Sequence, residues 1–192
     1  MTKTKKKSNG NSFLGTLAAL IILCVVLTIV SDKFLTYNNL MSVLKQTTFT
    51  ALLSTGMLLC LITAGIDLSV GANATFCACI CGMLVKGGMT NSLVLIVIAI
   101  VAGTLIGLIN GLLLTRLHLP HPFVSTLGMK NFLWGASLLV VSSQMVSGFP
   151  DGVMALGSAT IGGFPVSFIV VVVIYVIMHI LLTRTSLGRS IY

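Results

Sequence analysis

Long apolar runs without charged residues are the feature that most constrains this chain. The hydrocarbon core of a bilayer is about 30 Å thick, and a helix needs about 20 apolar residues to cross it. Runs of roughly this length recur six times along the chain. Only 7% of the 192 residues are charged, whereas about a quarter are charged in an average globular domain. The sequence therefore excludes an ordinary soluble domain and predicts an all-α, polytopic bundle of about six transmembrane helices.

The expected membrane helices follow one another with short connections. They cover residues 13–30, 46–66, 68–85, 93–114, 123–141 and 166–182. Pro120 and Pro122 separate the fourth from the fifth, because proline cannot continue a helix. Residues 142–165 are rich in glycine and predict a loop. The first run has a basic start, as a cleaved signal peptide does, but no small-residue cleavage site follows it, which predicts a retained helix.

The distribution of positive charge indicates the orientation in the membrane. The formal net charge is +8, with three acidic residues. A basic chain can bind nucleic acid, but the lysines concentrated in the N-terminal tail indicate topology here, and we expect no nucleic-acid partner. With the N-terminus in the cytoplasm, the cytoplasmic set is Lys3, Lys5, Lys6, Lys7, Arg116, Arg184 and Arg189, and the opposite set is Lys33, Lys45 and Lys86.

The cysteines lie inside apolar runs, where a free thiol behaves as a small hydrophobic group. Cys77, Cys79 and Cys81 resemble a metal-binding cluster at first sight. Residues two apart on a helix point to different sides, however, so that only Cys77 and Cys81 share a face. The three histidines are also scattered. We therefore expect neither a metal site nor a disulfide framework.

Asp67 is an acid between two apolar runs, within the string GIDLSVG at 65–71. An acid at the bilayer centre costs about 2.5 to 3.5 kcal/mol, so its position needs a reason. In one hypothesis it caps a helix that begins at Leu68, accepting hydrogen bonds near Ser69. In the other, Gly65 and Gly71 break the helix inside the membrane, and the exposed backbone lines a polar pathway. Both hypotheses can hold together.

Two further helices contain residues that a simple membrane anchor does not need. Gly103, Gly107 and Gly111 form a double GxxxG pattern, which predicts close helix packing. Asn110 beside them is expected to form an interhelical hydrogen bond, or alternatively to line a pathway.

Lys130 and Trp134, four residues apart, share a helix face. Either they face a cavity, where an indole stacks on a sugar and an ammonium donates to hydroxyls, or Lys130 extends to the interface and Trp134 faces lipid. The sequence contains no nucleotide-binding loop, catalytic triad or HExxH pattern, and we expect no enzyme activity and no cofactor in this chain.

Five strings together resemble the permease subunits of bacterial ABC importers for monosaccharides, the ribose, allose, galactose and xylose group. They are FLTYNNLMSVLKQTT at 34–48, GIDLSVG at 65–71, GLING at 107–111, HPFVSTLG at 121–128 and RTSLGRSIY at 184–192. They occur in the family's order. The family commonly has an arginine before a glycine in its fifth span, where this chain has Trp134 and Gly135, and Lys130 lies one turn earlier.

The resemblance implies the front part of a larger permease fold in the bacterial cytoplasmic membrane, because the family's chain continues beyond Tyr192. It implies a basic cytoplasmic tail at 1–12, a transmembrane region at 13–182 and the start of a cytoplasmic coupling segment at 183–192. Gly188, Arg189 and Tyr192 would contact the ATPase, and Asp67 and Ser69 would belong to the signature turn.

The implied partners are an ABC ATPase subunit that carries ATP and Mg²⁺, an extracytoplasmic sugar-binding protein, a second permease subunit and the bilayer. The implied function is import of a ribose-like or allose-like sugar. Two alternatives remain open: a small assembly or regulatory subunit without transport, and half of an ion-coupled secondary transporter in which Asp67 binds a proton or cation.

Overall fold

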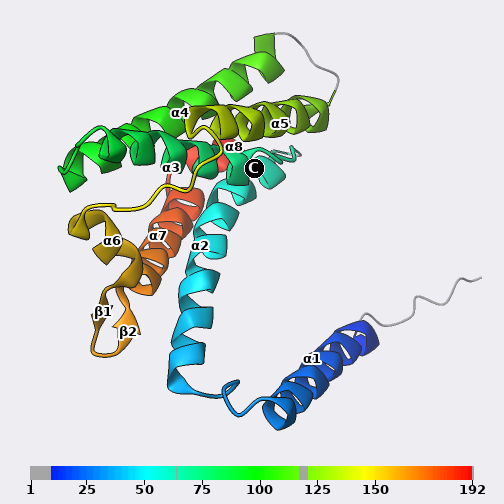
Figure 1. The fold of residues 1–192 in the computed structure, drawn as a ribbon. Coiled ribbons are helices and arrows are strands. Elements are labelled where there is room, and N and C mark those ends of the chain that lie inside the picture. Colours follow the sequence, from blue (N-terminus) through cyan, green and yellow to red (C-terminus); the bar gives the residue numbers. More distant parts are fainter. Residues whose placement is uncertain (1–9, 64, 117–120, 192) are drawn as a thin grey trace, which may run out of the picture. The chain divides into compact units, whose positions relative to one another are not determined.

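Eight α-helices and one two-stranded hairpin make up the described residues, 10–63, 65–116 and 121–191, in a computed structural model (Figure 1). The chain divides into two compact units, Met1–Leu44 and Lys45–Tyr192. In the first unit, α1 (Gly10–Val30) is followed by a turn and by the start of α2 (Tyr37–Ile62). Thr36 precedes α2, and its hydroxyl accepts a hydrogen bond from the Asn39 amide at 3.4 Å, in the manner of an N-cap.

Three helices of the second unit lie side by side as a layer: α3 (Val70–Lys86), α4 (Ser92–Arg116) and α5 (Pro122–Val140) (Figure 1). α3 contacts both of the others. Its buried face carries small residues, namely Ala72, Cys77, Cys81 and Gly82. Small side chains allow helices to approach closely, which explains the central place of α3.

The remaining elements of the second unit follow α5. They are α6 (Asp151–Ser158), β1 (Thr160–Ile161), β2 (Phe164–Pro165), α7 (Val166–Arg184) and α8 (Ser186–Ile191). The two strands pair antiparallel through Thr160 with Pro165 and Ile161 with Phe164. Gly162 and Gly163 connect them with φ values of 58° and 88°, which glycine adopts without strain in a tight hairpin turn. The Tyr175 hydroxyl of α7 donates to the Ala51 carbonyl of α2 at 3.2 Å.

The all-α prediction is confirmed, and each of the six expected membrane segments coincides with a long helix: α1, α2, α3, α4, α5 and α7. Among the described residues, three of these are long and apolar enough to cross a membrane by length and composition, at Phe13–Val30, Ser92–Arg116 and Val166–Arg184. α3 is a shorter apolar helix of 17 residues. The chain is therefore a polytopic helical membrane protein.

The predicted boundaries were wrong at two places. α2 begins at Tyr37 rather than at residue 46, because polar residues such as Asn38 and Asn39 do not interrupt a helix although they interrupt an apolar run. Residues 142–165 were expected to be a loop, but they contain α6 and the hairpin. Short elements of this kind carry too few residues to show a periodicity in the sequence.

Segment 142–165 is fastened to the other helices at both ends. Lys86 at the end of α3 donates to the Gln144 Oε1 at 3.1 Å, and Lys45 of α2 donates to the Ser158 carbonyl at 3.2 Å. Gly152 of α6 lies so close to Ser92 that a Cβ atom added to it would fall 2.6 Å from the Ser92 Oγ. The segment is therefore ordered by contacts with Lys45 of α2, with the end of α3 and with the start of α4.

Replacing Gly82 with alanine should destabilise the protein by about 1–3 kcal/mol, the usual cost of overpacking a filled core. A Cβ atom at Gly82 would lie 3.0 Å from the Val146 Cβ and closer still to its Cγ1. The measurement is the thermal unfolding midpoint in detergent. Adding Val146→Ala should restore it, and Gly107→Ala, which has no atom within 4 Å of the new Cβ, is the control. Equal midpoints for Gly82→Ala and the control would contradict the contact.

Candidate functional site

The helix break between α2 and α3 is built from local hydrogen bonds. α2 ends at Ile62, and the Thr63 hydroxyl donates to the Cys60 carbonyl at 2.9 Å. The Gly65 amide donates to the same carbonyl at 2.8 Å, and a Cβ atom at Gly65 would lie 3.2 Å from that oxygen. The Cys60 carbonyl in the last turn of α2 thus finds two donors without water, as a helix that ends inside a membrane requires.

Asp67 closes the second half of the break. Its Oδ1 accepts hydrogen bonds from the Ser69 amide at 2.8 Å and from the Ser69 hydroxyl at 2.6 Å. This is the turn that an aspartate forms with the backbone two residues later. α3 then begins at Val70. The hydrogen bond to Ser69 that the capping hypothesis expected is present, but the hypothesis is wrong about the N-cap, which is Ser69 and not Asp67, because α3 begins two residues later than Leu68.

Gly71 does not take part in the break. It lies inside α3, and a Cβ atom added to it would have no atom within 4 Å. The predicted break at 65–71 is therefore wrong at its far end, because the turn closed by Asp67 permits a regular helix directly after Ser69.

A chain of buried hydrogen bonds connects the break to α4 and α5. The Asn110 Nδ2 of α4 donates to the Ser69 hydroxyl at 3.2 Å, and the Ser125 hydroxyl of α5 donates to the Asn110 Oδ1 at 3.2 Å. Ser69, Asn110 and Ser125 are 3%, 8% and 9% exposed. All three hydrogen bonds run in the same direction, from Ser125 through Asn110 and Ser69 to the Asp67 carboxylate. Hydrogen bonds ordered in this way polarise one another.

Thr126 adds a second connection between α5 and the break. Its hydroxyl donates to the Ile66 carbonyl at 3.0 Å, and the residue is 6% exposed. Ile66 has no helical partner for this carbonyl, since it lies between α2 and α3. The N-terminal part of α5, which begins at Pro122, therefore satisfies the Ile66 carbonyl that the break leaves without a helical partner.

A small cavity of about 160 Å³ lies beside this network. It is lined by residues of the break, of α2, α4 and α5: Cys60, Thr63, Gly65, Ile66, Asp67, Gly107, Asn110, Gly111, Leu114, Pro122, Ser125 and Thr126. A cavity of this size with several polar groups can hold small polar molecules such as water. The cavity thus brings together Asp67, Asn110 and Gly65, three of the residues that the sequence analysis selected as pathway candidates.

A larger cavity of about 650 Å³ lies between α3, α4 and α6 and has mostly apolar walls. Asn73 is its main polar residue, and its amide donates to the Gly103 carbonyl at 3.2 Å. The Cys77 thiol lies 3.4 Å from the Asn73 Oδ1. Cys77 and Cys81 are free and buried on one face of α3, as their spacing predicted.

The glycine stripe of α4 is split between two roles. A Cβ atom at Gly103 would lie 3.6 Å from the Cys77 Sγ, so this glycine packs against α3 as expected. A Cβ atom at Gly107 or Gly111 would have no atom within 4 Å, and both glycines line the small cavity. Within the part of the chain that the structure describes, no helix packs on these two glycines, because spacing along one helix does not say which positions meet a neighbour.

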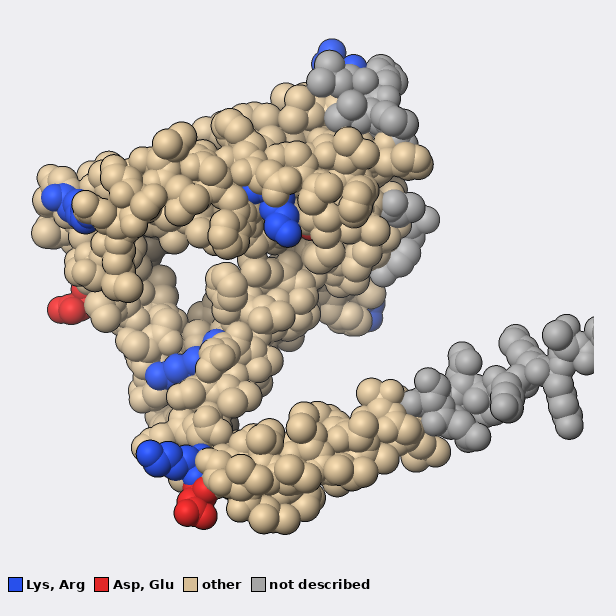
Figure 2. Space-filling model, turned by 45° about the vertical axis from the view of Figure 1, so that its right-hand side comes forward, with Lys and Arg blue, Asp and Glu red and all other residues tan. Residues whose placement is uncertain are grey.

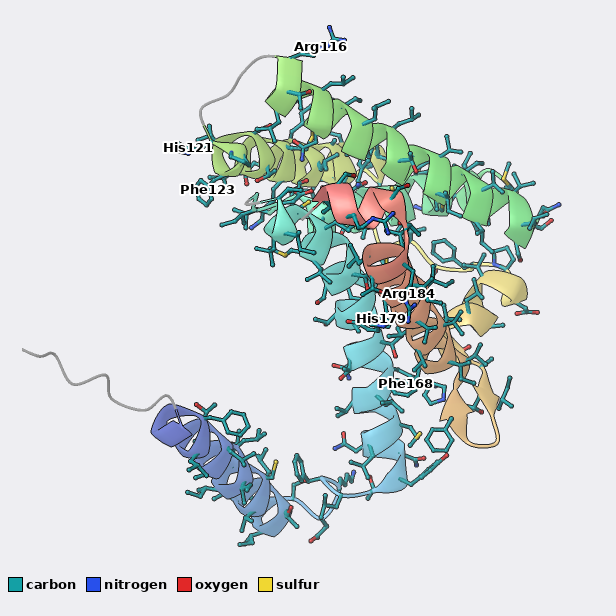
Figure 3. The ribbon with its side chains drawn as sticks, turned by 180° about the vertical axis from the view of Figure 1, so that it is seen from behind. Arg116, His121, Phe123, Phe168, His179 and Arg184 are labelled. Carbon is teal, nitrogen blue, oxygen red and sulfur yellow. The ribbon has the colours of Figure 1, made fainter. Side chains whose placement is uncertain are left out.

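The coupling candidates lie at the end of the described residues. Gly188 is buried against the end of α7, whereas Arg189 is exposed on α8. Tyr192 lies outside the described residues. Figure 3 shows Arg116 at the end of α4 and His121 and Phe123 at the start of α5. Most of the face drawn in Figure 2 is uncharged, as expected for a membrane protein.

Ser125, Thr126 and Thr63 were missed as site residues by sequence reasoning. Ser125 and Thr126 lie within HPFVSTLG, and two adjacent hydroxyl residues one turn after a proline were the available signal. Such pairs also bond to their own helix, as Thr126 does with the Phe123 carbonyl at 3.4 Å. A pair of adjacent hydroxyl residues in the sequence therefore does not show whether the hydroxyls bond within their own helix or to another segment.

The family is decided by a comparison with known protein families. A family described as "Branched-chain amino acid transport system / permease component" matches residues 39–192. The chain belongs to this family. The resemblance to sugar importer permeases agrees with the individual relatives, which are transport permeases and not enzymes.

Two permeases of this family show the extent of the similarity. The D-allose transport system permease protein AlsC of Escherichia coli K12 is 31% identical over 192 residues, which cover 98% of this chain and 59% of the relative. The ribose import permease protein RbsC of Bacillus subtilis 168 is 33% identical over 182 residues, 93% of this chain and 56% of the relative.

A third relative is named for another substrate. The autoinducer 2 import system permease protein LsrC of Photorhabdus laumondii is 29% identical, with 97% of this chain and 56% of the relative covered. The chain thus spans little more than half the length of these permeases. No solved structure is a significant match to it.

Trp134 and Lys130 lie outside the hydrogen-bond network at the helix break in this permease-family chain. Neither lines the two cavities, and Trp134 is 57% exposed. In the complete permease, Trp134→Ala should therefore leave uptake within about twofold, as for a surface substitution. Leu133→Ala, at a position that is 1% exposed on the same helix, should lower stability by about 2–5 kcal/mol. A large loss of uptake in Trp134→Ala at normal abundance would contradict this placement.

Proposed function

We propose that this chain is the N-terminal portion of a permease subunit of an ATP-driven importer, which moves a monosaccharide from an extracytoplasmic binding protein into the cytoplasm. The observation that carries the proposal is the buried network of Asp67, Ser69, Asn110 and Ser125 beside a small polar cavity in otherwise apolar helices. A membrane anchor has no need for such a network, because polar groups inside a membrane are costly.

The substrate in this proposal is a ribose-like or allose-like sugar. Support comes from the relatives named for D-allose and ribose import, which are similar to this chain along nearly its whole length. The relative named for autoinducer 2 import makes that compound the competing substrate to be tested.

The energy source in this proposal is ATP and Mg²⁺ bound to a separate ATPase subunit, because the sequence of this chain contains no nucleotide-binding loop. The complete assembly would contain a second permease subunit, identical or related. α8 and Arg189 would contact the ATPase, and the exposed guanidinium suits an acidic surface. Asp67, Ser69 and Asn110 would line the pathway or hold its helices in place.

The location in this proposal is the bacterial cytoplasmic membrane, with the N-terminus in the cytoplasm. Support comes from the lysines of the N-terminal tail and from Arg116, Arg184 and Arg189, which follow the rule that positive residues remain inside. Reporter fusions after Lys86 and after Arg116 test it. An extracytoplasmic reporter is expected to be active only after Lys86, and the reverse result would contradict the orientation.

The test of the function is uptake of labelled ribose, allose and autoinducer 2 by cells in which the gene is deleted. The expected result is loss of ribose or allose uptake, restored by a plasmid copy. Depletion of ATP should abolish the uptake, whereas a protonophore at constant ATP should not. Unchanged uptake of all three compounds would favour the assembly subunit, and uptake abolished by the protonophore alone would favour the secondary transporter.

A further inference from the structure

The corner between α7 and α8 consists of a single residue. α7 ends at Arg184 and α8 begins at Ser186, so that Thr185 alone changes the chain direction. Its backbone is extended, with φ −100° and ψ 159°. Because the connection is one residue long, the angle between the two helices depends on the contacts between them.

The Thr185 side chain bonds to both helices. Its hydroxyl donates to the Leu181 carbonyl in the last turn of α7 at 2.6 Å. The same oxygen accepts a hydrogen bond from the Gly188 amide in the first turn of α8 at 3.1 Å. Threonine is a good N-cap residue, and this contact is the capping bond to the third residue of the helix. One hydroxyl thus ties the end of α7 to the start of α8.

Gly188 allows α8 to press directly against the backbone of α7. A Cβ atom added to it would fall 2.6 Å from the Leu182 Cα and closer still to the carbonyl oxygens of Leu181 and Leu182. These are backbone atoms, which cannot move aside as a flexible side chain can. Gly188 is buried by its own chain, whereas Arg189, the next residue, is exposed.

We propose that Thr185 and Gly188 form a rigid elbow, in which α8 is fixed on α7 so that a displacement of α8 by the ATPase moves α7 with it. The proposal rests on the proposed function, since it requires an ATPase that contacts α8. The role of Gly188 in this proposal differs from the one that the sequence implied. Gly188 holds α8 in position for contact with the ATPase and does not itself touch the ATPase. Thr185, which sequence reasoning did not select, is the second positioning residue.

The fixation acts on the first turn of α8. Forming the first turn is the costly step of helix formation, because it fixes several residues for one hydrogen bond. Without the Thr185 cap and the close approach at Gly188, α8 would change its angle or lose its helical form under load. ATP hydrolysis would then proceed without moving α7.

The test compares Thr185→Val, which keeps the shape but removes the hydroxyl, with Thr185→Ser, which keeps the hydroxyl. Both are made in the full-length permease, assembled with its ATPase subunit and binding protein in proteoliposomes. Three quantities are measured: hydrogen exchange of the α8 amides, ATP hydrolysis, and sugar imported per ATP hydrolysed.

Thr185→Val should increase amide exchange in α8 about fivefold and reduce sugar imported per ATP by a similar factor, which corresponds to one intramolecular hydrogen bond. The ATPase should still co-purify and hydrolyse ATP. Thr185→Ser should behave as the unaltered protein. Gly188→Ala should uncouple transport more strongly than Thr185→Val, with Gly157→Ala as its control, because a Cβ atom at Gly157 has no atom within 4 Å.

Normal sugar imported per ATP in Thr185→Val would overturn the elbow, and so would equal losses in Thr185→Val and Thr185→Ser. Failure of the proposed function looks different, because the unaltered transporter would then show no ATP-driven sugar uptake. Amide exchange in α8 is measured without transport and therefore reports on the Thr185 bond in either case.

Discussion

Replacing Asp67 with leucine should abolish sugar uptake by the complete permease, whereas replacing it with asparagine should leave most of it. The Asp67 Oδ1 accepts bonds from both the amide and the hydroxyl of Ser69, which is 3% exposed. Leucine removes the acceptor and leaves buried donors unpaired, at about 1–3 kcal/mol each. Asparagine keeps an oxygen in the same position and forms the same turn.

The measurement pairs uptake with the amount of permease in the membrane. Asp67→Leu should show reduced abundance, because a helix break whose turn is not closed inserts and folds poorly, and Asp67→Asn should show normal abundance. Equal loss of uptake in both variants at normal abundance would contradict this structural role of the turn. It would instead assign the negative charge a direct part in transport, as the ion-coupled alternative requires.

Replacing Asn110 with leucine should destabilise the protein by about 1–3 kcal/mol for each partner left without a bond. The Asn110 side chain both donates to the Ser69 hydroxyl and accepts from the Ser125 hydroxyl. Loss of Asn110 therefore separates α4 from the break and from α5 at once. The thermal unfolding midpoint in detergent measures the effect, with Thr104→Val as control because the Thr104 hydroxyl is exposed and bonds to the Ile100 carbonyl of its own helix.

A double-mutant cycle with Ser125→Ala tests whether the bond is direct. Bonded pairs have interaction energies of about 0.5–3 kcal/mol, and hydrogen bonds between membrane helices average about 0.6 kcal/mol. We expect the two substitutions together to cost less than the sum of their separate costs, because each already breaks the same bond. Additive costs would place Asn110 and Ser125 in independent environments.

The sequence located the helices well because the apolar runs are set by the bilayer and not by neighbouring helices. It also predicted that Asp67 accepts a hydrogen bond near Ser69, since an aspartate bonds locally to the backbone two residues later, but it took Asp67 for the N-cap of the helix and not for the start of a turn. It did not separate Gly103, which packs on α3, from Gly107 and Gly111, which do not. That difference depends on where α3 crosses α4, and no local pattern encodes the crossing.

The same limit explains the residues that sequence reasoning missed. Ser125 and Thr126 matter because their hydroxyls reach Asn110 and Ile66, which lie 15 and 60 residues away along the chain. Gly71 was selected because glycine often marks a break, but it lies in regular helix. The elbow at Thr185 was missed because its bonds to α7 and α8 appear only when the two helices are placed.

The order of residues in the polar network has a consequence for synthesis of the protein. Asp67 finds Ser69 only two residues later, Asn110 then meets Ser69, and Ser125 meets Asn110. A ribosome produces these residues in the same order, from the N-terminus onward. Asn110 thus enters the bilayer after Ser69, to which it donates, and Ser125 enters after Asn110, to which it donates. The nascent chain can release its helices into lipid one after another, and each side-chain donor of the network then has its acceptor already made, while only the Asn110 Oδ1 awaits a donor, Ser125, 15 residues later.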